Sequence, residues 1–392
     1  MIRSSRTQLL VVLLSTLIAL GLAEIVLRLT GLRLSASFYE LDFLTGWKLR
    51  AGASGWQTVE GDTFIEISGE SMRDKPRLRA KPPGSLRVAL LGDSFVESMQ
   101  VSLEKTFGAV MEPLLAKCAA KPAEVLNYGV TGYGTAQELI AYRHRAAGFA
   151  PDVVALVVFA GNDLYNNVRA LNPTNADAAP YYRLGQNGAL DFVEPFAEDG
   201  KPRPASLWMR ARFRDLHGSL RLVQLGTEAY YNWQRRKGRA ADQSRITQAY
   251  GKDWMEWLAY VPPRDETMRE SWMVTQKLLL QFRDAVAKDG RRFLLVLANN
   301  AIQVLPNEAD RRRFAERYAI ESMDYADLRL KQFAESNGIS VVWLAEPLRK
   351  VAEKDQAYLH GFGMGKGSGH WNEAGHKAVA EQVAAGVCGL LR

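Results

Sequence analysis

Cysteine and histidine are scarce in this sequence. Its 392 residues include two cysteines, Cys118 and Cys388, and five histidines. The two cysteines lie far apart along the chain, and no pair of cysteines or histidines has the spacing of a zinc site. This scarcity argues against a metal centre built from these residues.

Runs of positive charge are also missing. The chain has 50 Lys and Arg against 43 Asp and Glu, a formal net charge of +7, and its basic residues are scattered. This distribution predicts weak attraction to anionic surfaces and no nucleic-acid partner. Around Gly92 the chain lacks the later glycines of a dinucleotide-binding loop and the GK[ST] of a P-loop, so nucleotide binding is disfavoured.

Long hydrophobic runs are absent, with one exception near the N-terminus. Residues 9–32 read LLVVLLSTLIALGLAEIVLRLTGL, a run long and apolar enough to cross a bilayer. Two arginines precede it and favour an N-in orientation, although Arg28 near its far end and Arg33 after it oppose that orientation. We expect residues 1–32 to be a single-pass anchor in the inner (cytoplasmic) membrane, with the rest of the chain in the periplasm. The alternative is a cleaved signal peptide, with the small residues of GLA at 21–23 as its cleavage site.

The rest of the chain divides into a polar lead-in, residues 33–85, and a larger domain, residues 86–392. The lead-in has one strand-like stretch, TFIEIS at 63–68, and ends in a Pro-Pro-Gly break. Five short runs rich in Val, Leu and Ile follow it. They do not alternate apolar with polar residues, which is typical of strands buried on both faces of a sheet. These runs are residues 86–91, 123–128, 152–159, 291–298 and 339–344.

Helical patterns separate these runs, over residues 103–118, 267–289, 308–335 and 373–391. Alternating strands and helices predict a three-layer α/β fold with a parallel five-stranded sheet in the flavodoxin-like order 2-1-3-4-5. In that order the helix with Cys118 and the helix with Cys388 share one face of the sheet. We therefore predict a Cys118–Cys388 disulfide; the alternative is two buried free thiols.

The segment between the third and fourth predicted strands is too long for one crossover. We interpret residues 164–265 as an insertion in the sheet domain. Its sequence predicts a hairpin that turns at Asn187-Gly188, followed by basic helices that contain aromatic residues. Those aromatic residues are expected to form a local core; the alternative is a surface that lies on a membrane or binds glycan.

Polar residues and glycines follow the predicted strands, at the edge where an open parallel sheet binds its ligands. A serine, flexible glycines, an amide and a histidine would meet there, and acyl transfer needs such a nucleophile, such oxyanion donors and such a base. Taken alone, the serine would fit a turn or a helix cap equally well. The four blocks are Gly92-Asp93-Ser94, GVTGYGT at 129–135, Gly161-Asn162-Asp163 and GSGHWNEAGH at 367–376.

In this order the four blocks resemble those of the SGNH (GDSL-type) hydrolase superfamily, and especially its bacterial membrane-anchored members. The resemblance implies that Ser94 is the nucleophile and His370 the catalytic base. It also implies an oxyanion hole formed by the backbone N–H groups of Ser94 and Gly132 and the side-chain amide of Asn162, with Gly129 a less favoured choice than Gly132. The last block is completed by Asn372, Gly375 and His376.

The chain departs from the family pattern at one place. The family has an Asp two or three residues before the catalytic histidine, where this chain has Ser368 and Gly367. Such an acid holds the imidazole tautomer and stabilises the imidazolium. Ser368, a backbone carbonyl and Glu346 are the candidates to orient His370, and we expect a Ser94–His370 dyad oriented by a backbone carbonyl.

These residues predict a serine-dependent ester hydrolase that acts through an acyl-Ser94 intermediate and requires no metal or organic cofactor. Relatives of the superfamily suggest that its substrate is an O-acyl group of a cell-envelope glycan or lipid. One alternative is an O-acyltransferase, such as an acetyltransferase of exopolysaccharide or envelope modification, supplied by a membrane acyl-donor protein. The missing Asp motivates a second alternative, a catalytically weak glycan-binding scaffold.

Overall fold

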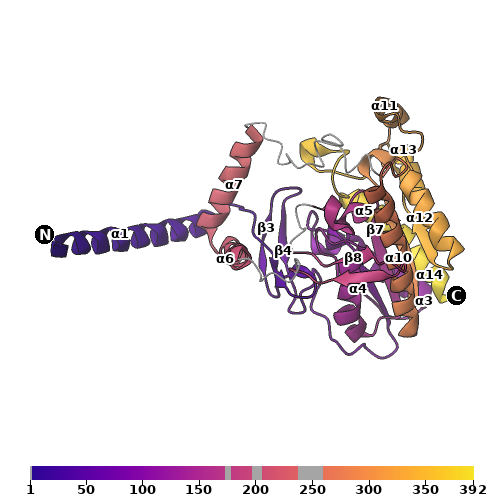
Figure 1. The fold of residues 1–392 in the computed structure, drawn as a ribbon, viewed down its shortest axis with the longest axis horizontal. Helices are drawn as coiled ribbons and strands as arrows, with labels where there is room; N and C mark the ends of the chain where they lie inside the picture. Colours follow the sequence, from indigo (N-terminus) through magenta and orange to yellow (C-terminus); the bar gives the residue numbers. More distant parts are fainter. Residues whose placement is uncertain (1, 173–177, 197–204, 237–258) are drawn as a thin grey trace.

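A computed structural model describes residues 2–172, 178–196, 205–236 and 259–392 of the chain. The first element, α1 (Ile2–Leu29), projects away from the rest of the protein as one long exposed helix (Figure 1). Its segment Thr7–Leu29 has a mean hydropathy of 2.6 and is long and apolar enough to cross a membrane, a property that signal sequences share. An apolar N-terminal helix is therefore present, as the sequence predicted.

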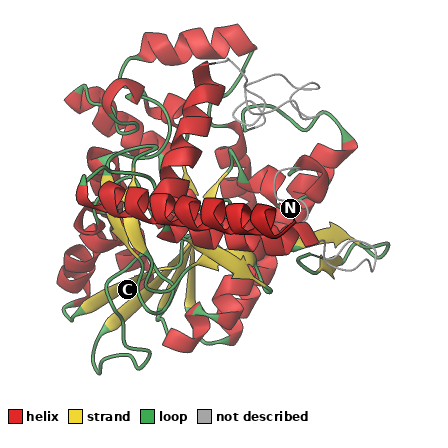
Figure 2. Ribbon diagram, turned by 90° about the vertical axis from the view of Figure 1, so that its left-hand side faces the viewer, coloured by secondary structure: helices red, strands yellow, loops and turns green. Residues whose placement is uncertain are grey.

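Five parallel strands form the central sheet in the order β6-β5-β7-β10-β11, with helices on both sides (Figure 2). The predicted strands and their 2-1-3-4-5 order are confirmed. Strand β5, which lies between β6 and β7, is buried along its whole length, which explains why its sequence has no polar alternation. The strands are β5 (Leu86–Leu91), β6 (Ala123–Asn127), β7 (Val153–Phe159), β10 (Arg292–Ala298) and β11 (Ser340–Trp343).

Successive side chains of β5 point to opposite faces of the sheet and into two separate cores. Val88 and Leu90 belong to the core under three helices, α3 (Phe107–Ala119), α13 (Ala345–Asp355) and α14 (Glu373–Leu391). Ala89 and Leu91 belong to the core under α4 (Thr135–His144), α10 (Glu266–Lys288) and α12 (Tyr325–Ser336). This period of two fixes the sheet as the middle layer of three.

The helix predicted over residues 308–335 is wrong in one respect, because the structure has two helices there. The first, α11 (Glu308–Tyr318), ends at Ala319, which has a left-handed φ of 50° and turns the chain. The second is α12, which begins at Tyr325. Helix α13, which follows β11 directly, was not predicted from the sequence.

Part of the insertion after β7 has the predicted structure. Strands β8 (Tyr181–Leu184) and β9 (Leu190–Val193) pair as an antiparallel hairpin, and Gly188 in its turn has a positive φ of 72°. Two helices follow, α6 (Ala205–Ser219) and α7 (Arg221–Arg236), which lie beside the end of α1 (Figure 1).

The lead-in is a folded part of the domain. It forms two antiparallel hairpins, β1 (Tyr39–Asp42) with β2 (Gly46–Leu49) and β3 (Ser54–Gln57) with β4 (Thr63–Glu66). The predicted stretch TFIEIS contains β4. The apolar residues of the lead-in enter the same core as α4 and α10, so the hairpins pack on the sheet domain through a common hydrophobic core. The buried apolar residues of the lead-in include Phe38, Trp47, Leu49, Ile65, Ile67 and Met72.

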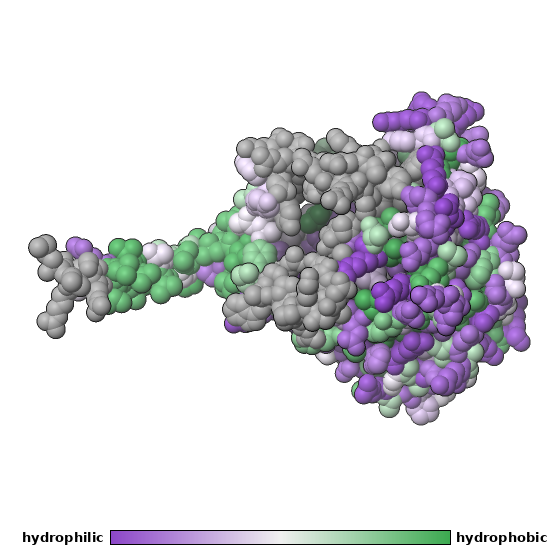
Figure 3. Space-filling model, viewed as in Figure 1, coloured by the Kyte–Doolittle hydropathy of each residue, from purple (hydrophilic) through white to green (hydrophobic). Residues whose placement is uncertain are grey.

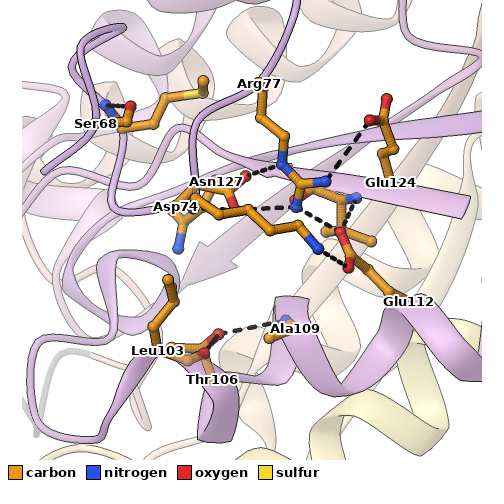
Figure 4. A network of polar contacts seen from close by, with 12 residues as sticks. Ser68, Asp74, Arg77, Leu103, Thr106, Ala109, Glu112, Glu124 and Asn127 are labelled. Carbon is orange, nitrogen blue, oxygen red and sulfur yellow. Dashed lines mark hydrogen bonds and ion pairs between the residues drawn. The ribbon is translucent and has the colours of Figure 1, made fainter. Parts of the chain in front are cut away.

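A buried arginine fastens the end of the lead-in to the sheet domain (Figure 4). Two nitrogens of Arg77 each donate to Asp74 at 2.9 Å. The same guanidinium pairs with Glu112 of α3 and lies 3.8 Å from Glu124 of β6. Because both side chains are almost fully buried, removal of Arg77 would leave the Asp74 carboxylate without its cation, at a cost of about 3–5 kcal/mol.

Cys118 and Cys388 form a disulfide in the structure, with their Cα atoms 6.1 Å apart. Cys118 lies near the end of α3 and Cys388 near the end of α14. Helices that connect parallel strands run antiparallel to them, so both helix ends lie at the edge opposite the carboxyl ends of the strands. The disulfide therefore ties the two helices together far from the serine.

Candidate active site

Ser94 lies where β5 turns into a short helix. Gly92 and Asp93 make the turn, and Ser94 is the first residue of α2 (Ser94–Glu97). The Asp93 carboxylate accepts a hydrogen bond from the Phe95 N–H at 2.9 Å and caps this helix. A Cβ atom at Gly92 would lie 2.4 Å from Val96, so the sharp turn requires glycine there. The turn leaves Ser94 partly exposed at the carboxyl edge of the sheet.

A chain of hydrogen bonds joins Ser94 to a histidine and a glutamate. The Ser94 Oγ lies 2.8 Å from His370 Nε2, and His370 Nδ1 lies 2.6 Å from Glu60 Oε2. The His370 backbone N–H also donates to Glu60 Oε1 at 2.7 Å. Glu60 therefore holds both the ring and the backbone of the histidine, in the manner of the acid in a serine–histidine–acid triad.

This network sets the protonation of the imidazole. A carboxylate can only accept, so Nδ1 carries the proton and Nε2 accepts from the Ser94 hydroxyl. Burial lowers the pKa of His370, but the hydrogen bond and charge of Glu60 outweigh it and the net pKa lies above its usual value. Burial raises the pKa of Glu60, but its bonds to His370 bring the net pKa below its usual value. Each partner thus stabilises the charged form of the other.

The predicted orienting groups for His370 are wrong. The Ser368 hydroxyl turns away and donates to the Gly365 carbonyl at 2.8 Å. Glu346 pairs with Lys350 on the exposed side of α13, at 2.6 Å. Glu60, and not a backbone carbonyl, accepts from Nδ1 of His370.

Glu60 was missed because it lies 310 positions before the histidine, in the loop between β3 and β4. No local spacing connects two residues so far apart. One feature near the histidine is consistent with the contact. A Cβ atom at Gly369 would lie 2.3 Å from Glu60 Oε1, so glycine before the histidine leaves room for this carboxylate.

A second histidine supports the loop that carries His370. His360 Nδ1 donates to the Gly369 carbonyl at 2.7 Å, and its Nε2 accepts from the Asn299 amide at 2.8 Å. Asn299 in turn accepts from the indole N–H of Trp371 at 3.2 Å. Burial lowers the pKa of His360 to about 4, so it stays neutral at ordinary pH and its bonds persist.

The two glycines considered for the oxyanion hole differ. The Gly129 N–H is already bonded to Asn127 Oδ1 at 2.9 Å, and a Cβ atom there would lie 2.2 Å from the Glu97 nitrogen. Gly129 is therefore a packing glycine. Gly132 has a positive φ of 78°, and the described residues offer its N–H no acceptor.

The loop around Gly132 is held beside the turn that carries Ser94. The Val130 N–H donates to the Gly92 carbonyl at 3.1 Å, and Trp47 of the lead-in donates to the Thr131 carbonyl at 3.0 Å. Both contacts fix the backbone close to the nucleophile turn without using the Gly132 N–H.

Asn162 lies on the other side of the same turn. Its side-chain amide donates to the buried carboxylate of Asp93, so it contacts the residue next to Ser94. One amide proton is used in this bond, which leaves the second for a ligand. Asn162 occupies the N-cap position of α5 (Asp163–Asn166), but its side chain does not cap that helix.

The remaining residues of the last block have structural contacts. Asn372 caps α14 by accepting from the Gly375 N–H at 3.0 Å. His376 is buried, accepts from the Phe107 N–H at 3.3 Å and stacks on the ring of that residue. Burial lowers the pKa of His376 to about 3, so it stays neutral. His370 is therefore the histidine of this block that faces the serine.

An open cleft lies beside Glu60, between two loops. One loop is residues 59–62 of the lead-in, which include Glu60; the other is residues 362–369, which end just before His370. Met364 at the tip of the second loop is fully exposed. Within the described ranges, no group of three or more His, Cys, Asp or Glu side chains is placed to hold a metal ion.

Comparison with protein-family models and with curated proteins finds no match. Among solved structures, the chain is similar to a lipolytic protein of the G-D-S-L family from Veillonella parvula, at 10% identity over 76% of this chain and 97% of that one, with a TM-score of 0.37. An acetylxylan esterase from Geobacillus stearothermophilus is 12% identical over 77% and 94%, with a TM-score of 0.38. An alpha/beta hydrolase enzyme from the metagenome of Lake Arreo, Spain, is 14% identical over 78% and 96%, with a TM-score of 0.37.

Proposed function

We propose that this protein is a serine-dependent ester hydrolase of the SGNH type. The observation that carries this proposal is the continuous hydrogen-bonded chain from Ser94 through His370 to Glu60. A serine in a helix cap needs no histidine 2.8 Å from its hydroxyl, and a structural histidine needs no carboxylate on its other nitrogen. The arrangement has the geometry of an activated nucleophile.

In the first half of the reaction, the Ser94 hydroxyl gives its proton to His370 Nε2 while its oxygen attacks the ester carbonyl. Glu60 stabilises the imidazolium that forms by accepting from Nδ1. Collapse of the tetrahedral intermediate breaks the bond to the alcohol, which leaves with the proton from Nε2. An acyl-Ser94 ester remains.

In the second half, His370 takes a proton from water, and the water oxygen attacks the acyl-Ser94 carbonyl. The Ser94 oxygen then leaves, recovers its proton from Nε2, and the carboxylic acid departs. In both halves we expect the negative oxygen to be held by the N–H groups of Ser94, Gly132 and Asn162.

The substrate proposed is an O-acyl group on a cell-envelope glycan or lipid. The open cleft between residues 59–62 and 362–369, next to the acid of the triad, supports a large substrate, since it is open to solvent. The apolar helix α1 supports a location at a membrane. The two arginines before its apolar run favour an N-in orientation and so support a periplasmic sheet domain. Glu60 removes the reason to favour a catalytically weak scaffold, because the place of the missing acid is filled.

The test is covalent labelling of the full-length protein with a fluorophosphonate, followed by peptide mapping. We expect the wild type and Ser368→Ala to be labelled on Ser94, and Ser94→Ala to remain unlabelled. Absence of label on the folded wild type would contradict the proposal. Hydrolysis of p-nitrophenyl acetate, with and without a glycan acceptor, then separates the two enzyme classes: acyl transfer to the glycan with little hydrolysis would identify an O-acyltransferase.

A further inference from the structure

Helix α7 has its polar and apolar sides reversed for a helix on a water-soluble domain. Two of its described polar residues face the protein: Gln224 is buried, and Glu228 accepts from the Ser35 N–H at 2.8 Å and from Thr58 Oγ1 at 3.2 Å. Surface helices normally bury the apolar side. Here large apolar side chains are 40–53% exposed instead. They are Leu225, Tyr230 and Trp233.

Helix α6, next to α7, exposes an apolar stripe of its own. Met209, Phe213 and Leu216 are spaced i, i+4 and i+7, so they lie on one face of the helix. Each is about half exposed, at 59%, 52% and 47%. We call these three residues together with Leu225, Tyr230 and Trp233 the α6–α7 apolar surface.

This surface lies where α1 meets the domain. Both carboxylate oxygens of Glu24 in α1 accept from the first N–H groups of α7, those of Arg221 and Leu222, at 3.0 Å each. Arg28 of α1 donates to the Ser219 carbonyl between α6 and α7 at 2.7 Å. A carboxylate at a helix N-terminus satisfies otherwise unpaired donors and is favoured by the helix dipole. These contacts fix α7 to the end of α1.

The direction of α7 matters as much as its position. Figure 1 shows α7 crossing the end of α1 steeply, with the sheet domain on the side away from α1. If α1 crosses a bilayer, α7 then runs along the bilayer surface. Its polar side faces the domain, so its apolar side faces the bilayer. Figure 3 shows the hydrophobic atoms of α1 continuing up to its junction with the domain.

We propose that the α6–α7 apolar surface rests in the headgroup region of the phospholipid bilayer that holds α1. Tyr230 and Trp233 are the side chains expected there, because Tyr and Trp concentrate at the boundary between hydrocarbon and water. An amphipathic helix in the plane of the interface buries its apolar side in this way. The inference rests on α1 as an anchor, which is part of the proposed function.

The same surface is connected to the triad. Glu228 bonds Thr58 Oγ1, and Thr58 is two residues before Glu60. The loop that supplies the acid of the triad is therefore held against a helix that lies on the membrane. The active site then works close to the bilayer surface, within reach of acyl esters of lipids and of glycans attached to them.

The test uses the full-length protein with one added cysteine, since both native cysteines are in a disulfide. Leu225→Cys and Phe213→Cys report on the surface, and Arg313→Cys on the exposed part of α11 is the matched control. Each variant is labelled with an NBD fluorophore and placed in nanodiscs of phosphatidylcholine and phosphatidylglycerol, with or without spin-labelled lipid. We expect the spin label to quench about half or more of the emission at 225 and 213. The control should change little.

Equal quenching at 225, 213 and 313 would overturn the proposal, because the surface would then be as far from the lipid as α11 is. Failure of the chain to stay with the discs would also overturn it, since α1 would not be an anchor. Hydrolysis of p-nitrophenyl acetate is measured on the same samples. A protein that hydrolyses the ester but is not quenched contradicts the membrane surface and leaves the esterase proposal intact.

Discussion

The sheet domain and the lead-in contribute to one triad in different ways. Ser94 and His370 come from the sheet domain, at the carboxyl edge of a parallel sheet. Glu60 comes from a loop between two short antiparallel strands that pack against that domain. The first part carries the nucleophile and base on a repeated β/α framework, and the second holds the base in position from outside it.

The lead-in depends on the sheet domain for its folding more than the sheet domain depends on the lead-in. The sheet domain has one core to itself, shares the other with the lead-in, and could hold Ser94 and His370 in place without Glu60. The lead-in has no separate core and depends on the domain through Arg77 and its buried apolar residues. Loss of the contact between Glu60 and His370 should therefore make the imidazole a weaker base while Ser94 stays in place.

The largest expected effect is that of Glu60→Gln. The amide cannot stabilise the imidazolium and can favour the wrong tautomer, so we expect kcat to fall by about 10³–10⁴. The remaining activity should have its rising pH limb at lower pH, because Glu60 raises the pKa of His370. Steady-state kinetics between pH 5 and pH 9 measure both changes. Glu346→Gln is the control and should leave kcat unchanged; a Glu60→Gln enzyme with wild-type kcat would refute the triad.

Asn162→Ala tests the part of the site that the sheet domain supplies alone. Loss of one oxyanion donor should lower kcat by about 10²–10³ with little change in KM, because the donor acts on charge that develops in the transition state. Asn162 also bonds Asp93, so fluorophosphonate labelling and circular dichroism are measured alongside. A rise in KM with unchanged kcat would show that Asn162 binds the ground state instead.

The comparison also shows what sequence reasoning can reach. The buried strands and the four blocks could be predicted because strands buried on both faces have a distinct pattern, and parallel strands end at one edge. Glu60 could not be predicted, because its loop has no repeating apolar pattern and its distance from His370 in space depends on how the hairpins pack. The same limit applies to α7, whose polar side proves to face the domain only once Glu228 is seen to bond Ser35 and Thr58.

The disulfide tests stability apart from chemistry. Replacement of Cys118 and Cys388 by serine should lower the free energy of unfolding by about 2–4 kcal/mol, since the crosslink restricts the unfolded chain. Urea unfolding followed by fluorescence measures this change. The kcat of the variant should equal that of the wild type below its unfolding midpoint, because the bridge lies at the edge opposite Ser94. A lower kcat in fully folded protein would show that the two ends of the sheet are coupled.

The smallest expected effect concerns Glu97, which joins the two regions. Its buried carboxyl accepts from Tyr39 of the lead-in at 2.9 Å and from the Thr131 hydroxyl beside Gly132. Burial raises the pKa of Glu97 to about 7. A raised pKa in the folded state means that this group favours folding below about pH 4.5 and loses that contribution as the pH rises through about 7.

Glu97→Gln removes this titration. Wild-type stability should therefore fall by up to roughly 3 kcal/mol more than that of the variant between pH 4.5 and pH 8. Urea unfolding at both pH values measures the difference, and Glu346→Gln, whose carboxyl is exposed, is the matched control. If the wild type and Glu97→Gln lose stability equally, Glu97 does not titrate in this range. The contact between Tyr39 and the Gly132 loop would then be independent of pH, as is the contact of Trp47 with the Thr131 carbonyl.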